Sequence, residues 1–574
     1  MQNYNCKQSL NQQIADFKIT NTEHIDAVND DGNQENIPII DLGKFRLYQH
    51  GLYAWIKSKN EQDNGQFERI GNYILPVGKT NLDGISCLLL EFTDSNSNKI
   101  DFMLERGELA DYRGLIKRLL NAGYVMDLYY SRQLQTYLNE YQPESNIIAT
   151  RQTGWINNNY VMPDRIIGDN NSIRYYGAIA NDRFISNGTV QEWREQVAKN
   201  CEGYDILELS LYAGFSSLLM PYVDFGFGLH IHGKSSGGKT TALRVASSIF
   251  GNPKTYISKW NSTHNGMEFY GYNSNHSLCA LDEVNEAAKT TLDSIYMLID
   301  GRGKTRAISR VGGVEQAKPK TWQTVALSTG EVSIEDLALQ YSKNLKAGES
   351  VRMIDIEVSY ICKDKAHSDL LIENTAKYHG TANIALIEYI QVNKPDISTM
   401  YKNAYSRLIN QYKELHSQAS RVAKYFALMC VAGDLAITAG IIPNTFKPSY
   451  YTDNQFKTWY KCHQHDKEFM QVIDALITAV DDGDNYFARN DEMTKNKPNL
   501  IGIFDGFEYY LISSLAARKL YKKTSFNTER KILQDAGILS SNRINKRIMF
   551  MSNKPTHVYQ IIITKLDNYR GDNE

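Results

Sequence analysis

The stretch that decides the fold reads GKSSGGKT and spans residues 233–240. It fits the pattern GxxxxGK[ST] in full, follows a short apolar run (FGLHIH) and opens a helical segment (KTTALRVASSIF). Glycines in such a loop let backbone N–H groups close around phosphate oxygens, and the N-terminus of the following helix adds a positive field. The sequence therefore predicts a phosphate-binding loop (P-loop) between a strand and a helix. The alternative is a Gly/Ser turn that precedes a helix by chance.

Two side chains at the end of this loop have separate expected roles. Lys239 would reach the β- and γ-phosphates of ATP, and the Thr240 hydroxyl would bind Mg²⁺. The residues expected to surround the nucleotide are Gly233, Lys234, Ser235, Ser236, Gly237, Gly238, Lys239, Thr240 and Thr241.

An acidic pair ends the next predicted strand, since LCALDE covers residues 278–283. Asp282 would hold Mg²⁺ through water, and Glu283 would orient and deprotonate the attacking water. An Asp-Glu pair favours an ATP hydrolase over a kinase, because a kinase must exclude water. The alternative is an ordinary strand that ends at a polar helix cap.

Two more positions are expected to act on the γ-phosphate. The strand TVALSTG brings Ser328 or Thr329 to its end as a polar sensor, with Thr329 taken as the site residue and a simple helix cap as the alternative. Arg352 precedes the last core strand and would act as an arginine finger on a neighbour's nucleotide, an effect worth roughly 10³–10⁵ in rate. A surface Arg paired with Glu349 or Asp355 is the alternative.

Basic residues are concentrated locally, although 63 Lys+Arg against 65 Asp+Glu give the whole chain a net charge of −2. Residues 301–322 carry six basic residues and one acidic residue. The alternation over 306–310 and the Gly-Gly turn after it predict a β-hairpin inserted before the sensor strand. A solvated charged hairpin is the alternative to DNA binding. The expected DNA contacts are Lys304, Arg306, Arg310, Lys318 and Lys320.

A second basic segment lies near the C-terminus. Residues 516–554 carry ten basic residues against two acidic ones. Helical patterns come first, and two β runs (RIMFM and VYQIII) follow, which is the outline of a winged helix. Such a segment is an electrostatic footprint for DNA, although winged helices also mediate protein contacts.

Cysteine usage and hydropathy exclude several classes. The seven cysteines are scattered without a CxxC pair, so a disulfide framework or a zinc ribbon is not expected. The N-terminus has no apolar signal region. The longest apolar stretch, 425–442, contains Asp434 and is interpreted as a buried helix, because a charge at the centre of a bilayer is costly. We expect a cytoplasmic protein with no membrane contact.

With these residues identified, the chain resembles the domain-of-unknown-function 927 family. These are P-loop ATPases of bacterial plasmids, prophages and integrative or cassette elements, related to AAA+ helicases of superfamily 3 and the MCM type. The resemblance covers about residues 45 to 445. It rests on TGW (153–155), the loop at 233–240, KWNST (259–263), LDE (281–283), YML with GRGKTR (296–306), LSTGE (327–331), and the stretches 348–352 and 421–436.

The resemblance implies a second γ-phosphate sensor at Arg421, on a helical lid. Some members carry an N-terminal primase module, for which the polar tail of this chain leaves no room. The family often reads Ala-Gly-Glu where this chain has Ala-Gly-Asp434, a mild change.

Composition and periodicity predict the domain organisation, centred on an α/β core with a parallel sheet around the P-loop, and the resemblance implies that this core is an AAA+-like ATPase. The expected segments are a disordered polar tail (1–40), a small α+β domain with an antiparallel sheet and one helix over 109–123 (41–165), the ATPase core (166–365), a helical lid (366–466) and a winged-helix-like domain (467–574).

The first functional hypothesis is an ATP-dependent DNA helicase that forms a ring, with a hexamer expected, and serves replication or mobilisation of a mobile genetic element. Its cofactors would be ATP and Mg²⁺. Its partners would be single- or double-stranded DNA and replication proteins of the host or element. The alternative is a non-unwinding, DNA-binding ATPase switch, for instance in phage defence. A protein-remodelling machine is disfavoured, because it would want an aromatic, hydrophobic pore loop and this hairpin is basic.

Overall fold

The computed structural model describes residues 37–57, 65–168, 172–177, 181–284, 290–310, 313–316, 318–341, 348, 351–463, 467–489, 499–522, 525–546 and 556–570. The polar tail up to residue 36 and the RIMFM run lie outside this part. The chain divides into two compact units, Met1–Ala149 and Thr150–Glu574.

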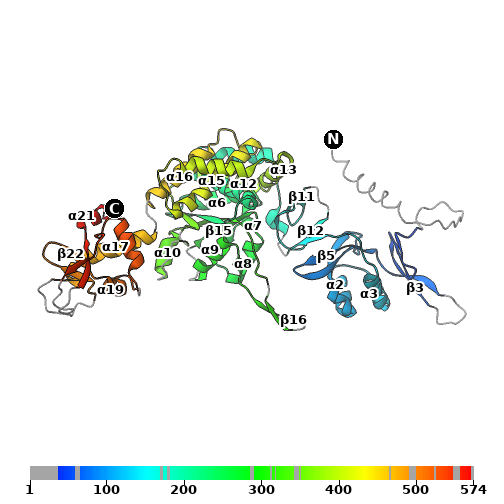
Figure 1. Cartoon of the computed structure of the whole chain (residues 1–574). Coiled ribbons are helices and arrows are strands. Elements are labelled where there is room, and N and C mark those ends of the chain that lie inside the picture. Colours follow the sequence, from blue (N-terminus) through cyan, green and yellow to red (C-terminus); the bar gives the residue numbers. More distant parts are fainter. Residues whose placement is uncertain are drawn as a thin grey trace. The chain divides into compact units, whose positions relative to one another are not determined.

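The first unit contains two antiparallel sheets (Figure 1). One is ordered β1 (Ile40–Asp41), β2 (Phe45–Tyr48), β3 (Gly51–Ile56), β4 (Gln66–Gly71), and the other β5 (Ile74–Leu82), β6 (Ile85–Thr93), β7 (Lys99–Glu105). The helices are α2 (Tyr112–Asn121) and α3 (Ser131–Glu140). The prediction of a single helix is therefore wrong. The signal for α3 was present, because Leu134, Tyr137 and Leu138 have helical i, i+3, i+4 spacing and are buried.

The second unit is built on a five-stranded sheet in which all neighbours are parallel. Its order is β14 (Ser258–Lys259), β15 (Leu278–Asp282), β18 (Val325–Gly330), β13 (Phe227–His232), β19 (Met353–Glu357). Four connections pass from one strand to another that is parallel to it, and helices lie within them. The predicted α/β fold with a parallel sheet is confirmed.

Both faces of this sheet are covered, as strands of buried parallel sheets require. Along β15, Leu278 and Ala280 join one core and Cys279 and Leu281 join the other. The first core includes α5 (Asp205–Ser216), α6 (Lys239–Ser247) and α15 (Ser417–Thr438), and the second includes α8 (His264–Tyr272), α9 (Thr290–Asp300) and α10 (Ile334–Gln340). The two sets lie on opposite sides of the strands (Figure 1).

Between α9 and β18 the chain forms the predicted hairpin. β16 (Ala307–Arg310) pairs antiparallel with β17 (Gly313–Gln316), with Ala307 opposite Gln316. The hairpin extends away from the core on the side of α8 and α9 (Figure 1). The backbone of the insertion is thus the β structure that the alternating residues predict.

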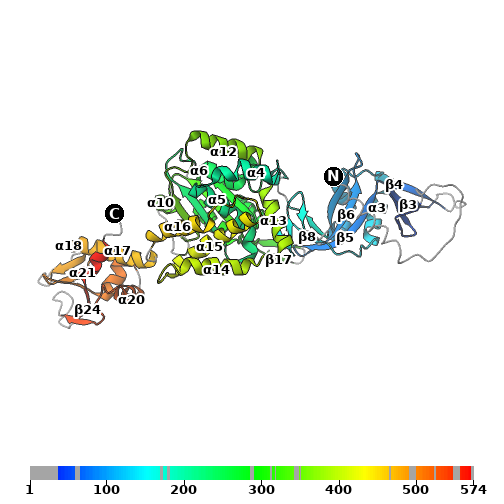
Figure 2. The same ribbon diagram turned by 90° about the horizontal axis from the view of Figure 1, so that it is seen from above.

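After β19 the chain is helical, and these helices pack with α5 over one face of the sheet (Figure 2). They are α12 (Lys365–Lys377), α13 (Ala382–Asn393), α14 (Ile397–Ile409), α15 and α16 (Pro448–Lys461). Most of the apolar stretch 425–442 lies in α15, which ends at Thr438, and this helix buries most of its side chains from Tyr425 to Ala436, as predicted. None of the described helices is long and apolar enough to cross a bilayer.

Smaller elements before β13 are β8 (Ile148–Thr150), β9 (Gly154–Ile156), β10 (Asn159–Val161), β11 (Ile166–Ile167), β12 (Ile173–Tyr175) and α4 (Val190–Gln196), and α7 (Pro253–Tyr256) follows α6.

The C-terminal segment has its own five-stranded sheet, with the order β20-β21-β22-β24-β23. Its elements are α17 (Lys467–Asp481), α18 (Gly483–Tyr486), β20 (Phe487–Arg489), β21 (Gly502–Phe504), β22 (Tyr509–Leu511), α19 (Ser513–Leu515), α20 (Asn527–Asp535), β23 (Ile544–Lys546), β24 (Thr556–Ile561) and α21 (Ile563–Leu566). The VYQIII run forms most of β24. The sequence analysis missed β20, β21 and β22, because three residues per strand are too few for a period-2 pattern.

A buried histidine connects the central strand to β18. The His230 ring contacts the Ser328 hydroxyl through Nδ1 (2.9 Å) and the Val332 carbonyl through Nε2 (2.9 Å). Because a carbonyl only accepts, Nε2 carries the proton and Ser328 donates to Nδ1. The Trp260 indole in turn donates to the Ser328 oxygen (2.8 Å). The neutral ring therefore satisfies every partner in this chain of hydrogen bonds.

This arrangement predicts that acid weakens the core. Burial lowers the pKa of His230 to about 3. The unfolded chain binds a proton near pH 6.5 and the folded chain does not, so stability falls as the pH drops below that value. Between pH 8 and pH 5 the loss from this one residue is about 2 kcal/mol. Unfolding midpoints of the wild type and a His230→Asn variant should be measured at both pH values.

The variant should show a smaller difference between the two midpoints than the wild type, whatever its absolute stability. His276, whose pKa burial lowers to about 4, contributes equally in both proteins. An identical pH dependence in the two proteins would mean that His230 is not held neutral.

Candidate functional site

The glycine-rich loop joins β13 to α6 at the carboxyl end of the central strand. Gly233 has φ +143°, and a Cβ there would lie 2.1 Å from the Val358 carbonyl oxygen. Gly238, with φ +88°, caps the start of α6. Residues with side chains rarely adopt these backbone angles. The path of the loop therefore requires glycine at both fixed positions of the motif.

Lys239 is folded back over this loop. Its Nζ donates to the carbonyl oxygens of Gly233 (2.9 Å) and Lys234 (2.7 Å). Burial lowers the pKa of Lys239, and the charges of Glu331 and Asp282 oppose that change. The ammonium group is thus held within the curve of the loop, where an anion could replace the two carbonyl oxygens as its partner.

Asp282 lies at the point where three segments meet. One carboxylate oxygen is 3.3 Å from the Thr240 hydroxyl, which donates to it. The other accepts hydrogen bonds from the Thr329 hydroxyl and from the backbone N–H of Glu283 (3.0 Å). The structure therefore brings together Thr240, Asp282 and Thr329, which are far apart in the sequence.

Glu283 projects from the same strand end in an unusual conformation. Its φ is +60°, a left-handed value that costs a residue with a side chain some free energy. Its carboxylate forms an ion pair with Lys259, at the end of the edge strand β14. Lys259 was part of the family resemblance, but no role was predicted for it. Lys259 therefore helps to determine the direction of the Glu283 carboxylate.

The structure separates the two candidate sensors. Ser328 is buried between His230 and Trp260, and both make hydrogen bonds to its hydroxyl. Thr329, the next residue, contacts Asp282. Because consecutive residues of a strand face opposite ways, only one of them can face the loop. The position that faces the loop is Thr329.

The glycine-rich loop and the acidic strand end line one cavity of about 910 Å³, which we call the loop pocket. Every residue of 235–241 contributes to its wall, together with Asp282, Glu283, Gly330 and Glu331. A second wall, which the sequence analysis missed, comes from the segment after β19. Its lining residues are Tyr360, Cys362, Lys363, Asp364, Lys365 and Ser368. Tyr360 is 86% exposed, a high value for an aromatic ring.

Arg352 lies at the other edge of the sheet. It immediately precedes β19, and its carbonyl oxygen accepts a hydrogen bond from Gly228, near the start of β13. Its guanidinium forms an ion pair with Asp300 (2.9 Å). Asp355, one of the two partners considered from sequence, is instead half-buried and accepts from the Ile334 N–H (3.0 Å). Glu349 lies outside the described residues.

Arg421 lies near Arg352. Burial raises the pKa of Tyr425 to about 12, and the nearby charges of Arg421 and Arg352 oppose that rise. The Tyr425 ring stacks on Phe227, the first residue of β13, with ring centroids 4.9 Å apart. Both arginines therefore lie beside the starting edge of the sheet.

The basic residues around the hairpin differ in their surroundings. Arg306 makes a two-point contact with the buried carboxylate of Glu268 (2.7 and 3.0 Å), which anchors the root of the hairpin to α8. The Lys320 ammonium lies over the rings of Phe269 (5.4 Å) and Tyr272 (5.1 Å). Lys304 and Lys318 are exposed, and the side chain of Arg310 lies outside the described part.

Several basic residues of the C-terminal segment are already engaged. Arg530 and Arg543 both donate to the Tyr559 hydroxyl (3.0 and 2.9 Å). Lys546 forms an ion pair with Asp505 and lies over the Tyr510 ring (3.4 Å). Lys522 and Lys531 remain partly or fully exposed. Part of the positive charge of this segment is therefore neutralised within the fold.

The loop pocket fits Mg²⁺ through the Thr240 hydroxyl and the Asp282 carboxylate. Oxygen is the ligand that Mg²⁺ prefers, and this ion commonly takes one or two protein ligands together with water and phosphate oxygens. No cluster of three or more His, Cys, Asp or Glu side chains suited to a metal occurs in the part of the chain that the structure describes. A site with two protein ligands suits a metal ion whose other ligands are water and the phosphate oxygens of a bound nucleotide.

We compared the sequence and the fold with those of known proteins. Residues 45–319 match the family described as "Domain of unknown function (DUF927)". The fold is similar to that of the structure titled "SCCmec type IV Cch - active helicase", with a TM-score of 0.71 and 20% identity over 92% of this chain and 100% of that chain. No curated protein matches the chain.

The structure titled "The A form apo structure of NrS-1 C terminal region-CTR" covers 84% of this chain and 96% of its own, with a TM-score of 0.29 and 10% identity. That likeness is too weak to carry an argument. The family match covers the loop, the acidic pair and most of the hairpin insertion, and it confirms the resemblance seen in the sequence. The likeness to the DUF927 family thus covers residues 45–319, a little under half of the chain.

Proposed function

We propose that this protein is an ATP-dependent DNA helicase that works as a ring, with a hexamer as the expected assembly, in the replication or mobilisation of a mobile genetic element. The observation that carries the proposal is that Lys239, Thr240, Asp282 and Glu283 line the loop pocket together. Thr329 contacts Asp282 from the neighbouring strand. Residues 233–241 act as a P-loop in this proposal, and the helices over 366–466 act as its lid. The fold shared with a structure whose title names an active helicase supports the choice among ATPases.

In the proposed reaction, Lys239 exchanges its two loop carbonyls for the β- and γ-phosphate oxygens of ATP. Glu283 orients the attacking water and takes its proton. To act as the base, its carboxylate leaves Lys259; the two side chains are 45% and 60% exposed, and an exposed ion pair of this kind holds them only weakly. Thr329 fixes the other face of Asp282 and thereby holds the acidic strand end against the loop.

Mg²⁺ would be held by Thr240 and Asp282, which already lie within hydrogen-bonding distance of each other. When bound, the ion neutralises charge on the β- and γ-phosphates. Asp282 keeps its position because Thr329 and the Glu283 N–H hold its second oxygen, which leaves the first oxygen for the ion.

The position of Arg352 supports the proposed ring. Gly228, beside Arg352, is five residue steps along β13 from Gly233 at the start of the loop, which is about 17 Å at 3.3 Å per residue. Arg352 therefore cannot reach the γ-phosphate of its own subunit, and it completes a site only on a neighbour. Arg421, beside it, fits the same neighbour-facing role better than that of a sensor for its own nucleotide.

DNA contact is assigned to the hairpin insertion and to the winged-helix-like segment. The insertion joins α9 directly to β18, the strand that carries Thr329. A movement of β18 at the γ-phosphate would therefore also move the insertion. Lys304, Lys318 and Lys320 are the candidate phosphate contacts, with Arg310 beside them in sequence. Arg306 serves the hairpin root instead. Replication proteins of the host or element would be the further partners, in the cytoplasm.

A second candidate is a DNA-binding ATPase switch that does not unwind. The Lys259–Glu283 ion pair is the observation that points to it, because a Glu283 carboxylate directed at Lys259 does not face the attacking water, and slow hydrolysis would give long-lived bound states. A forked-duplex assay with ATP and Mg²⁺ separates the two: a helicase releases the displaced strand, and a switch binds the fork without releasing it.

The first prediction concerns hydrolysis. Glu283→Gln should keep ATP affinity, because Lys239 and Asp282 still hold the nucleotide, but should lose most ATP turnover. Lys239→Ala should lose binding itself. Binding of a fluorescent ATP analogue and release of phosphate measure the two properties, with Lys461→Ala as a control for the loss of a distant exposed lysine. Wild-type turnover by Glu283→Gln would disprove the assignment of the base.

The second prediction concerns the shared site. Arg352→Ala should bind ATP nearly as well as the wild type but hydrolyse it about 10³-fold more slowly or worse. Mixing it with Glu283→Gln should restore some activity, at sites where the Glu283→Gln subunit offers Arg352 to a neighbour that retains Glu283. Equal ATPase activity of Arg352→Ala and the wild type at every concentration would remove the finger.

The third prediction concerns the hairpin. Replacing Lys318 and Lys320 by Ala should leave basal ATP hydrolysis intact, because neither residue lines the loop pocket. DNA-stimulated hydrolysis and strand separation should fall together, and the salt slope of single-strand binding should flatten by about 0.7 for each phosphate that is no longer bound. A matched control removes Lys457 and Lys461 from α16. Undiminished unwinding by the hairpin variant would make the hairpin a solvated surface loop.

A further inference from the structure

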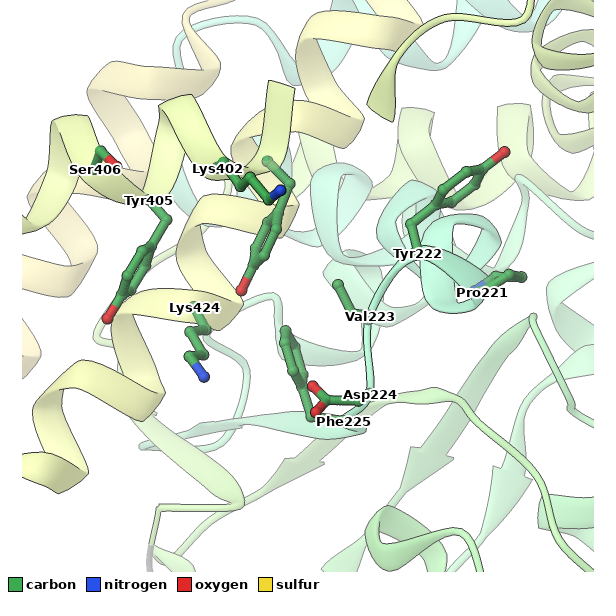
Figure 3. Close-up of a pocket in the computed structure, with 10 residues that line it drawn as sticks. Pro221, Tyr222, Val223, Asp224, Phe225, Lys402, Tyr405, Ser406 and Lys424 are labelled. Atoms are coloured by element: carbon green, nitrogen blue, oxygen red, sulfur yellow. The ribbon is translucent and has the colours of Figure 1, made fainter. Parts of the chain in front are cut away.

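A second cavity, which we call the aromatic pocket, lies between two helices and the segment that leads into β13. It has a volume of about 430 Å³. Tyr405 and Lys402 come from α14, Lys424 from α15, and Val223 and Phe225 from the incoming segment (Figure 3). None of these residues lines the loop pocket, so the two cavities have separate walls.

The aromatic rings at this pocket contact one another in a continuous series. Tyr401 and Tyr405 stack one helical turn apart, with centroids 6.5 Å apart and planes at 23°. Phe225 lies 6.3 Å from Tyr401 and 5.3 Å from Tyr425, whose ring stacks on Phe227. The inner rings are thus fixed by packing, while Tyr405 at the outer end is half-buried. A flat ring with a supported edge and an open face suits a planar ligand.

Positive charge accompanies the rings. Lys402 and Lys424 are exposed, and neither forms an ion pair with any residue that the structure describes. They reach the pocket from different helices (Figure 3). Asp224 is the one carboxylate in its wall, so cations outnumber anions there. Aromatic faces beside lysines are the features with which proteins hold single-stranded nucleic acid.

The aromatic pocket adjoins the root of the basic hairpin. The Gln323 side chain donates to the Val223 carbonyl (3.2 Å). A Cβ on Gly226 would lie 2.6 Å from the Ile299 carbonyl oxygen and 3.2 Å from that of Thr324. The segment that walls the pocket therefore packs against the chain on both sides of the 301–322 insertion.

We propose that the aromatic pocket holds one nucleotide of single-stranded DNA, with the base against Tyr405 and its phosphate between Lys402 and Lys424. The proposal rests on the DNA-motor function above and adds a stacking contact to the purely electrostatic one of the hairpin. The hairpin grips the backbone regardless of base, and the pocket holds a base that has left the duplex. A site of this kind discriminates single strands from duplex, because a paired base has no free face.

The experiment measures anisotropy of a labelled oligo(dT) with the full-length protein. Tyr405→Ala should weaken binding about tenfold or more, as the loss of one stacked base does. Tyr405→Phe keeps the ring and should bind like the wild type. Tyr450→Ala, an exposed tyrosine on α16, is the matched control. An oligonucleotide with abasic sites should bind the wild type more weakly than oligo(dT), and Tyr405→Ala should lose most of that difference.

Salt dependence separates the rings from the charges. Lys402→Ala with Lys424→Ala should flatten the salt slope by about 0.7 for each phosphate that is no longer bound, and Tyr405→Ala should leave the slope unchanged. The hairpin variant lacking Lys318 and Lys320 is measured alongside. If that variant loses affinity while Tyr405→Ala binds both oligonucleotides like the wild type, the pocket proposal fails alone. If the hairpin variant also binds like the wild type, the DNA-motor function fails with it.

A second copy of this chain is the other occupant that the pocket could take, because Arg352 and Arg421 lie nearby through Tyr425. Light scattering of the same variants tests it. A change in assembly mass of Tyr405→Ala without a change in DNA affinity would assign the pocket to the subunit interface and overturn the proposal. An unchanged mass with lost affinity supports it.

Discussion

The Asp282 carboxylate is the contact on which the arrangement of the site depends. Its two oxygens accept from Thr240, at the start of α6, from Thr329, near the end of β18, and from the backbone of Glu283. Each partner belongs to a different stretch of the sequence. A displacement of any one of them must therefore move the carboxylate or break a charge-assisted hydrogen bond, which is stronger than a neutral one. The loop, the acidic strand end and Thr329 are coupled through this carboxylate for this reason.

The parallel sheet divides this unit from a second set of features. The loop pocket lies at the carboxyl ends of the strands, where ligands of open α/β sheets bind. Arg352, Arg421, the hairpin root and the aromatic pocket lie at the starting edge. Strands paired on both sides are stiff, so the two edges cannot approach each other within a subunit. In the proposed helicase, ATP hydrolysis at one edge and DNA binding at the other would be coupled either through the strand that carries Thr329 or through a neighbouring subunit.

The features predicted correctly from the sequence are those that a short contiguous stretch determines. The loop, the acidic pair and the hairpin are contiguous stretches whose spacing alone specifies their shape, and each was predicted. Lys259 and Trp260 were not assigned roles, because their partners depend on which strand lies beside β15. The choice between Ser328 and Thr329 also needed the pairing register, in which Ser328 lies opposite Leu281 and Thr329 follows toward Asp282. Helix α3 was missed although its apolar residues have helical spacing. Strands β20 to β22 were missed because three residues are too few to show an alternating pattern.

The central claim is that one subunit supplies the loop pocket and its neighbour supplies Arg352 around a central DNA strand. Particle images of the wild-type protein with a non-hydrolysable ATP analogue, Mg²⁺ and single-stranded DNA test it most directly. We predict a closed ring in which each Arg352 has left Asp300 and faces the γ-phosphate of the adjacent subunit, with the strand held by the hairpins in the pore. Single subunits that bind nucleotide and DNA, or a ring with the DNA outside it, would contradict the claim.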